Sequence, residues 1–423
     1  MRDAYRSKAL VLGLLAGLIG GGCSCEPDLK PWPEAEAKGT LSLVEAANPE
    51  GGAAPTADGS DLTVPPREGD LGWWVDLAAA PDGTLHLAYT DAFNGELHHA
   101  QAKKEGGWEI TVVDAYGAVG KYPSIAVDGS GRPHLLYYNQ DKSRLYYATR
   151  VGAEKIDSDD RRRPFQGHPD WLFEVVDDGE EVGMASQLRA LPDGTVHALY
   201  YTAKEKLIHL ARPAGAPGEH QHWKRRTVDE KAGGSHSIEV GFLQGPDGTL
   251  HASYANWTVF DSQLRYATLA PGAEAWQSET LVTPANAGWK SGLVLDAKGH
   301  PQIAYLTLRN RRLILATRAE GGEGWKHQHL VGSANTMALV GTAKGALHLP
   351  HEHLPGVGMA DARLRLLTRP AGAGDEGWTL RNFGTRGAMA SYLAATLLPD
   401  GRLAVAFYDG GVRGVKVWTE DAN

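Results

Sequence analysis

The sequence predicts an all-β fold: one seven-bladed β-propeller built from four-stranded blades. Gly and Pro together make up about 18% of the 423 residues, against roughly 12% in average usage, which indicates many tight turns. A turn containing Gly recurs seven times between Gly83 and Gly401, about 53 residues apart. Four short apolar stretches accompany each turn, and four strands per repeat of this length are typical of a propeller blade.

Composition restricts the class of protein further. Apolar residues are 42% of the chain, enough for a large core, and charged residues are 22%. These values exclude a disordered chain, a coiled coil and a membrane protein with many spans, and the two cysteines exclude a disulfide scaffold. A chain of 423 residues usually forms two or three domains, but repeats can extend one domain to this length.

Residues 1–22 are typical of a secretory signal, with a basic start, an apolar run and small residues before Cys23. The apolar run is shorter than the ~20 residues that a membrane-spanning helix needs. The segment resembles the lipobox of bacterial lipoproteins, in which the cysteine after the cleavage site is acylated, although Gly20 replaces the usual Leu. This resemblance implies a lipid anchor on Cys23. The alternative is an ordinary signal peptide with two incidental cysteines.

The same resemblance implies a location in the cell. Ser24 follows the cysteine, where Asp would favour the inner membrane, so we expect a bacterial outer-membrane anchor facing the periplasm or the surface. Residues 23–38 are expected to form a stem. Removing residues 1–22 deletes three basic residues and one acidic residue, which shifts the formal net charge from −9 to −11. The negative net charge of the mature chain argues against nucleic acid as a partner.

Each repeat has the same anatomy, which justifies its four strands in order. A short apolar strand precedes the turn, where Gly accepts a positive φ without steric cost. A second strand carries His and Tyr, a third ends in a motif such as LYYATR, and a fourth begins at Trp. The turns with their second strands occupy 80–91, 127–139, 191–202, 245–256, 295–307, 342–353 and 399–409.

The last repeat lacks a fourth strand after GVKVWT (414–419). An open ring would expose sheet edges, which invite aggregation. Residues 39–47 have the size and pattern of a fourth strand, so we predict that this N-terminal segment completes blade seven and closes the ring. The propeller domain is then 39–423, with its repeats over 73–419. The alternative is a six-bladed ring with an additional hairpin.

The Asp-Gly-x-x-His-x-x-Tyr core of the repeats resembles the sialidase-like (BNR-type) propeller group of bacterial proteins. The resemblance covers nearly all of 73–419 and implies the propeller fold. Some members of the group are polysaccharide lyases, so the resemblance also implies a carbohydrate-active enzyme as one possible function. The Asp-box Ser-x-Asp-x-Gly-x-x-Trp is absent as such, and neither an arginine triad nor a Tyr/Glu nucleophile pair can be assigned.

One end of the ring is the expected ligand site. In a propeller, the loops from strand four to the next strand one, and from strand two to strand three, meet at one mouth of the central channel. Aromatic rings there can stack on sugar C–H faces while polar groups fix orientation, or the aromatics can simply cap the channel by packing together. The ligand-binding candidates are Trp73, Trp74, Tyr122, His236, Glu239, Trp289, Lys290, Arg386 and Tyr392.

Histidine recurs at one position of the second strands: His86, His134, His197, His251 and His348. We expect these copies to be structural, since a catalytic site needs one copy in an asymmetric place. Blade six differs, because His351 replaces the usual Tyr and His353 follows on the same face. These two histidines and Tyr392 are the catalytic candidates, for proton transfer in a β-elimination. As metal ligands the histidines lack an identifiable third partner, so neither a metal nor another cofactor is predicted.

The sequence has no P-loop, dinucleotide fingerprint, Gly-x-Ser-x-Gly elbow, Cys-x-x-Cys pair or His-Glu-x-x-His motif. We therefore expect an exported, lipid-anchored propeller that acts as a non-catalytic binding or scaffolding module for a glycan or a protein partner. The alternatives are a carbohydrate-active enzyme of the lyase or glycosidase type, and a purely structural part of an envelope complex.

Overall fold

The computed structural model describes most of the chain from Trp32 onward. The described residues are 32–47, 70–115, 117–151, 167–179, 182–202, 206–215, 221–233, 239–256, 262–282, 287–308, 310–318, 324–354, 362–383 and 392–422. The signal segment with Cys23, and the candidates His236 and Arg386, lie outside these residues. Within the described ranges there is no helix, and hence none that is long and apolar enough to cross a membrane.

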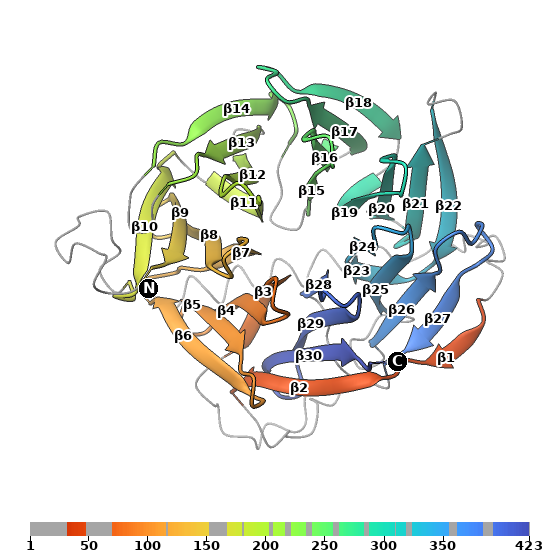
Figure 1. Ribbon diagram of the computed structural model, residues 1–423, viewed down its shortest axis with the longest axis horizontal. Coiled ribbons are helices and arrows are strands. Elements are labelled where there is room, and N and C mark those ends of the chain that lie inside the picture. The colour runs from red at the N-terminus through yellow and green to blue at the C-terminus, as the bar shows by residue number, and fades with distance from the viewer. Residues whose placement is uncertain are drawn as a thin grey trace. The chain divides into compact units, whose positions relative to one another are not determined.

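The described chain forms seven sheets, antiparallel except for one short edge strand in blade six, which are arranged as the blades of a ring and confirm the predicted propeller (Figure 1). Each blade is built from the axis outward, because consecutive strands pair with one another. The innermost strands are β3 (Leu71–Ala79), β7 (Lys121–Val127), β11 (Val182–Ala190), β15 (Gly241–Gln244), β19 (Ala287–Leu295), β23 (Ala334–Met337) with β24 (Val340–Gly341), and β28 (Leu393–Leu397). The second strands are β4 (Leu85–Asp91), β8 (Pro133–Asn139), β12 (Val196–Thr202), β16 (Leu250–Asn256), β20 (Pro301–Thr307), β25 (Leu347–His353) and β29 (Leu403–Asp409).

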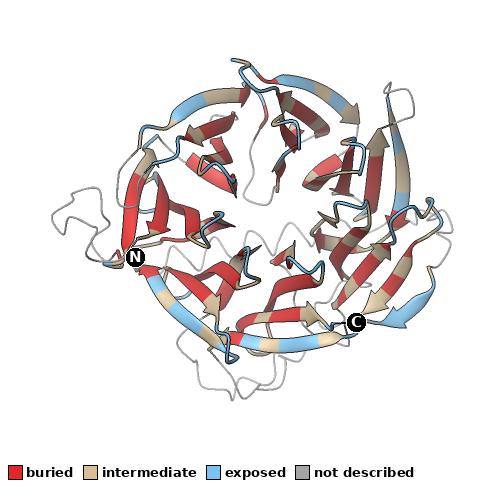
Figure 2. Cartoon of the chain, in the orientation of Figure 1, coloured by how far each residue is buried: buried red, intermediate tan, exposed pale blue. Residues whose placement is uncertain are grey.

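The outer half of each blade follows the same order. The third strands are β5 (Glu96–Ala102), β9 (Arg144–Arg150), β13 (Leu207–Arg212), β17 (Gln263–Leu269), β21 (Leu313–Arg318), β26 (Arg363–Arg369) and β30 (Gly414–Glu420). The outermost strands are β6 (Trp108–Asp114), β10 (Trp171–Asp177), β14 (Lys224–Asp229), β18 (Gln277–Val282), β22 (Trp325–Val331), β27 (Thr379–Asn382) and β2 (Gly39–Ala46). Burial follows this radial position, since the second strands are mostly buried and several outermost strands are exposed (Figure 2).

The ring closes as predicted. β2 pairs antiparallel with β30, which places Leu41 opposite Trp418 and makes β2 the outermost strand of blade seven. Gly414 is required at this pairing, because a Cβ there would lie 2.2 Å from the Glu45 carbonyl oxygen. The strand that precedes the first repeat and the strand that ends the last one are therefore neighbours in one sheet.

Blade six has one strand more than the four expected. β1 (Glu34–Glu36) pairs parallel with β27 at the outer edge of the blade. Just before it, the Trp32 indole N–H donates to the Leu330 carbonyl of blade five at 2.8 Å. The described end of the segment expected to be a stem, 23–38, thus contacts two blades.

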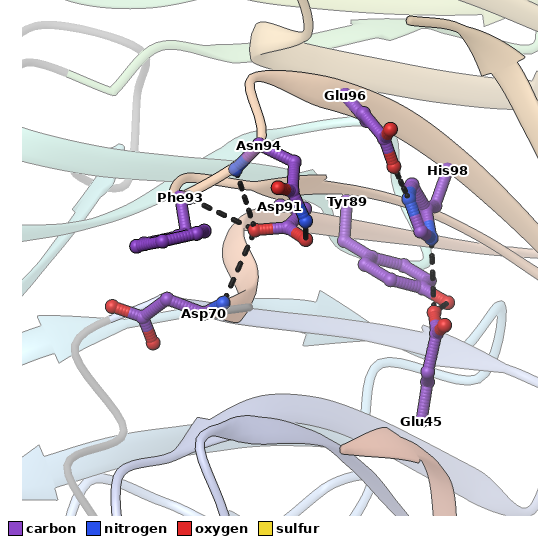
Figure 3. A network of polar contacts seen from close by, with 8 residues as sticks. All are labelled: Glu45, Asp70, Tyr89, Asp91, Phe93, Asn94, Glu96 and His98. Atoms are coloured by element: carbon purple, nitrogen blue, oxygen red, sulfur yellow. Dashed lines mark hydrogen bonds and ion pairs between the residues drawn. The ribbon is translucent and has the colours of Figure 1, made fainter. Parts of the chain in front are cut away.

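Second-strand tyrosines join blades to their predecessors. Tyr137 donates its hydroxyl hydrogen to Asp114 at 2.8 Å, and Tyr254 donates to Asp229 at 2.9 Å. At the closing seam Tyr89 donates to Glu45 of β2 (Figure 3). Each accepting carboxylate directly follows a Val near the end of an outermost strand, so a Val-Asp or Val-Glu pair is the sequence signal of this contact.

The repeated histidines have the structural role predicted for them. His134 Nδ1 lies 2.6 Å from the Tyr147 hydroxyl on the third strand of its own blade, and His197 Nδ1 lies 2.9 Å from His209 Nε2. The third-strand ring then packs edge-on against the Trp that begins the outermost strand of the following blade, as Tyr147 does against Trp223 at 5.2 Å. The recurring His and Trp are thus two parts of one contact between blades.

Candidate functional site

The innermost strands begin with a β-bulge in several blades. The register of blade one shifts between Trp73 and Asp76, and blades two and three shift at the corresponding residues. Within these bulges Trp74, Tyr122 and Ala185 each have a φ of 50°. The left-handed region costs a non-Gly residue roughly 1–2 kcal/mol. Bulges of this kind re-aim side chains beside functional sites.

One residue per blade occupies this position around the ring axis. Trp74, for example, lies four residues before Ala78, which pairs with His86 on the second strand. In each of the other six blades, an inner-strand residue likewise pairs with the repeated His position of the second strand. The residue four positions before that inner-strand residue is the equivalent of Trp74. We call this ring of residues the collar: Trp74, Tyr122, Ala185, Glu239, Lys290, Thr336 and Tyr392.

Blades seven, one and two contribute an aromatic arc. The Trp74 ring centroid lies 5.1 Å from that of Tyr122 and 5.6 Å from that of Tyr392. Trp73 extends the arc, 5.5 Å from Tyr392. The Lys121 ammonium lies 5.9 Å from the Trp74 centroid, a cation–π contact. Burial raises the pKa of Tyr122 and of Tyr392, so both phenols keep their protons at neutral pH.

Blades four, five and six contribute a polar arc. The Lys290 ammonium donates to the Glu239 carboxylate and to the Thr336 hydroxyl, the latter at 2.9 Å. Lys290 is 7% exposed, whereas the Glu239 side chain is 38% exposed. The ammonium also lies 5.9 Å from the Trp289 ring centroid. Lys290 thus holds three blades together and leaves the carboxylate of Glu239 partly open to solvent.

Further along the inner strands, Asp76 of blade one and Arg189 of blade three interact. Blade two separates their blades, so the interaction runs across the inside of the ring. Asp76 accepts hydrogen bonds from the Ser124 hydroxyl at 2.8 Å and the Ile125 N–H at 2.9 Å. Burial raises the pKa of Asp76 and lowers that of Arg189, and each charge partly offsets the shift of the other.

The structure brings together every described ligand-binding candidate. The collar contains Trp74, Tyr122, Glu239, Lys290 and Tyr392, and the indoles of Trp73 and Trp289 lie beside it. The rings pack on one another, as the capping alternative expects, and all but Tyr122 are half-buried. Stacking of a sugar on these rings stays a prediction. Sequence reasoning missed Ala185, Thr336, Asp76 and Arg189. These residues could have been found from the repeated His position of the second strands, because each is the inner-strand partner of that position or lies a set number of residues before such a partner.

The histidines of blade six lie one strand outward from the collar, since the collar residue Thr336 pairs with Glu352 between them. His351 pairs in register with Met337 and Arg365, and its side chain is fully buried, with Nδ1 3.1 Å from the Leu349 carbonyl. Burial lowers the pKa of His351 and of His353 to about 4, so both are neutral bases at pH 7. A substrate cannot reach the enclosed ring of His351. No group of three His, Cys, Asp or Glu side chains suited to a metal occurs in the described ranges.

The comparisons with known proteins show the fold alone. The sequence matches no protein-family model and no curated protein. Among solved structures, a polysaccharide lyase described as an ulvan lyase superposes with a TM-score of 0.53 at 12% identity, covering 83% of this chain and 94% of that one. Hydrazine synthase of Kuenenia stuttgartiensis gives 0.50 at 13%, covering 81% and 94%. An intramolecular trans-sialidase of Ruminococcus gnavus gives 0.45 at 11%, covering 82% and 94%. A polysaccharide lyase is therefore among its structural neighbours.

Proposed function

We propose that the protein is an exported, lipid-anchored binding module that takes a glycan at the collar end of the ring. This proposal rests on the division of the collar into an aromatic arc and a polar arc. A sugar ring has apolar C–H faces and polar edges, so it can stack on half-buried indoles while its hydroxyls bond to Glu239 and Lys290. Left-handed backbone at Trp74 and Tyr122 supports a functional role, since such strain gathers at binding sites.

A glycan array with site variants tests this proposal. We expect Trp289→Ala and Trp73→Ala to weaken glycan binding about tenfold, or ~1.4 kcal/mol, because each removes a stacking surface. Ile110→Ala is the matched control, since Ile110 is an exposed large apolar residue, at 37%, on the outermost strand β6, far from the inner strands that carry the collar. If both Trp variants bind the glycan as tightly as the wild type, these two residues do not belong to the glycan-binding site. Absence of glycan binding by the wild type, with capture of an envelope protein, would favour a protein partner.

The second candidate function is that of a polysaccharide lyase, favoured by the likeness to a lyase propeller of similar length. At the collar, the partly exposed Glu239 carboxylate would take the proton from the carbon beside the uronate carboxyl group, and the Tyr392 phenol would protonate the leaving glycosidic oxygen. Incubation of the wild type with a panel of uronate polysaccharides, followed by ultraviolet absorbance of the unsaturated product, decides between the two. Product that disappears in Tyr392→Phe would establish the enzyme; no product from any polymer favours the binding module.

The lipid anchor on Cys23 is tested separately. We expect the wild-type protein to partition into the detergent phase and to incorporate a fatty-acid label. Cys23→Ser should abolish both, whereas Cys25→Ser should leave both unchanged. A labelled Cys23→Ser protein would show that the anchor lies elsewhere.

A further inference from the structure

A second candidate site lies at the other end of the ring. A cavity of about 240 Å³ is enclosed between blades two and three. Its wall includes Asp128 and Arg132 from the turn after β7, and Asp193 from the turn after β11. Because β7 begins at the collar and ends at this turn, the cavity and the collar lie at opposite ends of the inner strands.

The side chains beside this cavity explain why it stays open. Between blades five and six, Arg369 fills the corresponding place by donating to Gln302, which occupies the repeated His position, at 3.2 Å. Between blades two and three, the equivalent Arg212 donates to Glu174 on β10 at 2.9 Å instead, and its guanidinium lies over the Tyr147 ring on the cavity wall. The space next to His134 is therefore not filled by a neighbouring side chain.

The turn residues on the wall depart from the repeat. At the first and fifth positions of the turn, blade one has Ala80 and Thr84, whereas blade two has the charged pair Asp128 and Arg132. The half-buried Arg132 guanidinium has no hydrogen-bond or ion-pair partner in the part of the chain that the structure describes. A half-buried guanidinium without such a partner fits ligand recognition better than blade packing. Arg402, at the same turn position of blade seven, pairs with Asp400 instead.

The two carboxylates on the wall are acceptors at neutral pH. Burial alone would raise the pKa of Asp128, but hydrogen bonds with His134, Ser130 and the Arg132 N–H lower it overall. Hydrogen bonds from the Thr195 hydroxyl and N–H lower the pKa of Asp193. Arg212 is already neutralised by Glu174, so the wall carries a small negative excess, which disfavours an anionic ligand.

We propose that this cavity binds a single neutral sugar ring, either free or at the end of a glycan. A hydroxyl group both donates and accepts, so a polyhydroxylated ring can satisfy Asp128, Asp193 and Arg132 at once. The volume has room for about eight waters at ~30 Å³ each and lies below the usual range for drug-sized ligands, which suits one ring. Leu172 and Ala214 supply apolar wall for its C–H face.

Saturation-transfer NMR on the mature chain tests the proposal, with neutral methyl glycosides of common hexoses and of N-acetylhexosamines as probes. We expect at least one glycoside to bind, Arg132→Ala to weaken it tenfold or more, and Ala214→Trp to abolish binding by filling the cavity from its exposed rim. Arg402→Ala is the matched control, because Arg402 holds the same turn position in blade seven and should leave binding unchanged.

The outcomes separate this site from the collar. Binding that persists in Trp289→Ala but is lost in Arg132→Ala supports the cavity even if the collar binds no glycan. Tighter binding of an oligosaccharide that ends in the same sugar identifies a glycan end as the ligand, and equal or weaker binding identifies the free sugar. The proposal is overturned if no neutral glycoside binds at its highest soluble concentration, or if both Arg132→Ala and Ala214→Trp bind like the wild type.

Discussion

Three collar residues keep a backbone conformation that their own side chains disfavour. Trp74, Tyr122 and Ala185 sit at φ 50° in equivalent bulges of three adjacent blades. Gly would adopt this conformation without steric cost, so the retained side chains at Trp74 and Tyr122 indicate that the rings themselves are used. Ala185 has no such ring, so its backbone strain can be compared with that of a buried Ala in a regular strand.

We expect Ala185→Gly to change the free energy of unfolding by less than about 1 kcal/mol. The substitution relieves a left-handed backbone costing ~1–2 kcal/mol, but it loses a buried methyl worth ~0.8 kcal/mol and adds ~0.5–1 kcal/mol of unfolded-chain entropy. Ala198→Gly is the control: Ala198 is fully buried in a regular strand, so this variant gains no relief of strain and should be clearly less stable. Urea denaturation compares the two variants. Equal destabilisation by both would show that the bulge is not strained.

The Arg212–Glu174 pair should be far more sensitive than surface pairs. Both side chains are nearly buried, at 6% and 5% exposed, and Glu174 also accepts from the Trp223 indole at 2.7 Å. Arg212→Ala leaves a buried carboxylate without its main cation, which should cost about 3–5 kcal/mol. The exposed Lys326–Asp375 pair is the matched control, where solvent screens the charges and Lys326→Ala should leave the free energy of unfolding nearly unchanged. Similar unfolding free energies for both variants would contradict this account.

At the scale of the element, blades are joined by side chains that reach from one strand into the next sheet. Second-strand Tyr reaches back to a carboxylate, and outermost-strand Trp reaches back to a third-strand ring. The closing seam differs in one respect: Glu45 also binds His98, whose other nitrogen lies 3.0 Å from Glu96 (Figure 3). The contact that closes the ring therefore contains a group that titrates.

We expect the closing seam to weaken at alkaline pH. Although burial opposes it, Glu45 and Glu96 raise the pKa of His98 from 6.5 to about 9. Its contribution, at most about 3 kcal/mol, is thus full below pH 6.5 and is lost as the pH rises through about 9. The pKa of Glu45 is lowered despite burial, by His98 and then Tyr89, while Asp91 opposes, so acid weakens the same seam as Glu45 is protonated.

The difference in Tm between the wild type and His98→Gln measures this effect. The difference should be large at pH 6 and should shrink toward pH 10 as the wild-type imidazolium loses its proton. His300→Gln is the control, since the His300 side chain is 59% exposed beside Asp296 and should give no such trend. A constant difference across the pH range would exclude His98 as the titrating group.

At the scale of the whole molecule, one strand decides whether the ring is closed. β2 covers the edge of β30 and supplies Glu45 to Tyr89 and His98 of blade one. Without it, blade seven would present an unpaired edge, and the buried polar groups of blade one would lose their partner. Closure is therefore both a pairing of strands and a pairing of side chains.

Two truncations test this closure. A chain beginning at Trp32 keeps β1 and β2 and should fold as a monomer with the Tm of the mature protein. A chain beginning at residue 48 lacks both strands and should lose about 10 °C or more in Tm, or aggregate. Thermal unfolding and size-exclusion chromatography compare the two. A well-folded monomer of the shorter chain would mean that β2 is dispensable.

Much of the architecture could be read from local signals. The recurring Gly turn and Trp-led strand gave the number of blades, and the pattern of 39–47 gave the closing strand, since each signal depends on neighbouring residues only. The extra strand β1 could not be predicted, because three residues such as Glu34–Glu36 carry no strand pattern. Their position is set by the free edge of β27, which belongs to the other end of the chain.

The sequence by itself determined the repeat, the closed ring and the aromatic and charged residues near one end of its axis. Only the tertiary structure decided which of these meet: that Lys290 bridges Glu239 and Thr336, and that His351 is enclosed within its blade. The reason is physical. A structural repeat depends on contacts between residues that are close in the sequence. A site, in contrast, is formed by single residues from different blades, and the distances between them depend on how seven sheets close around one axis.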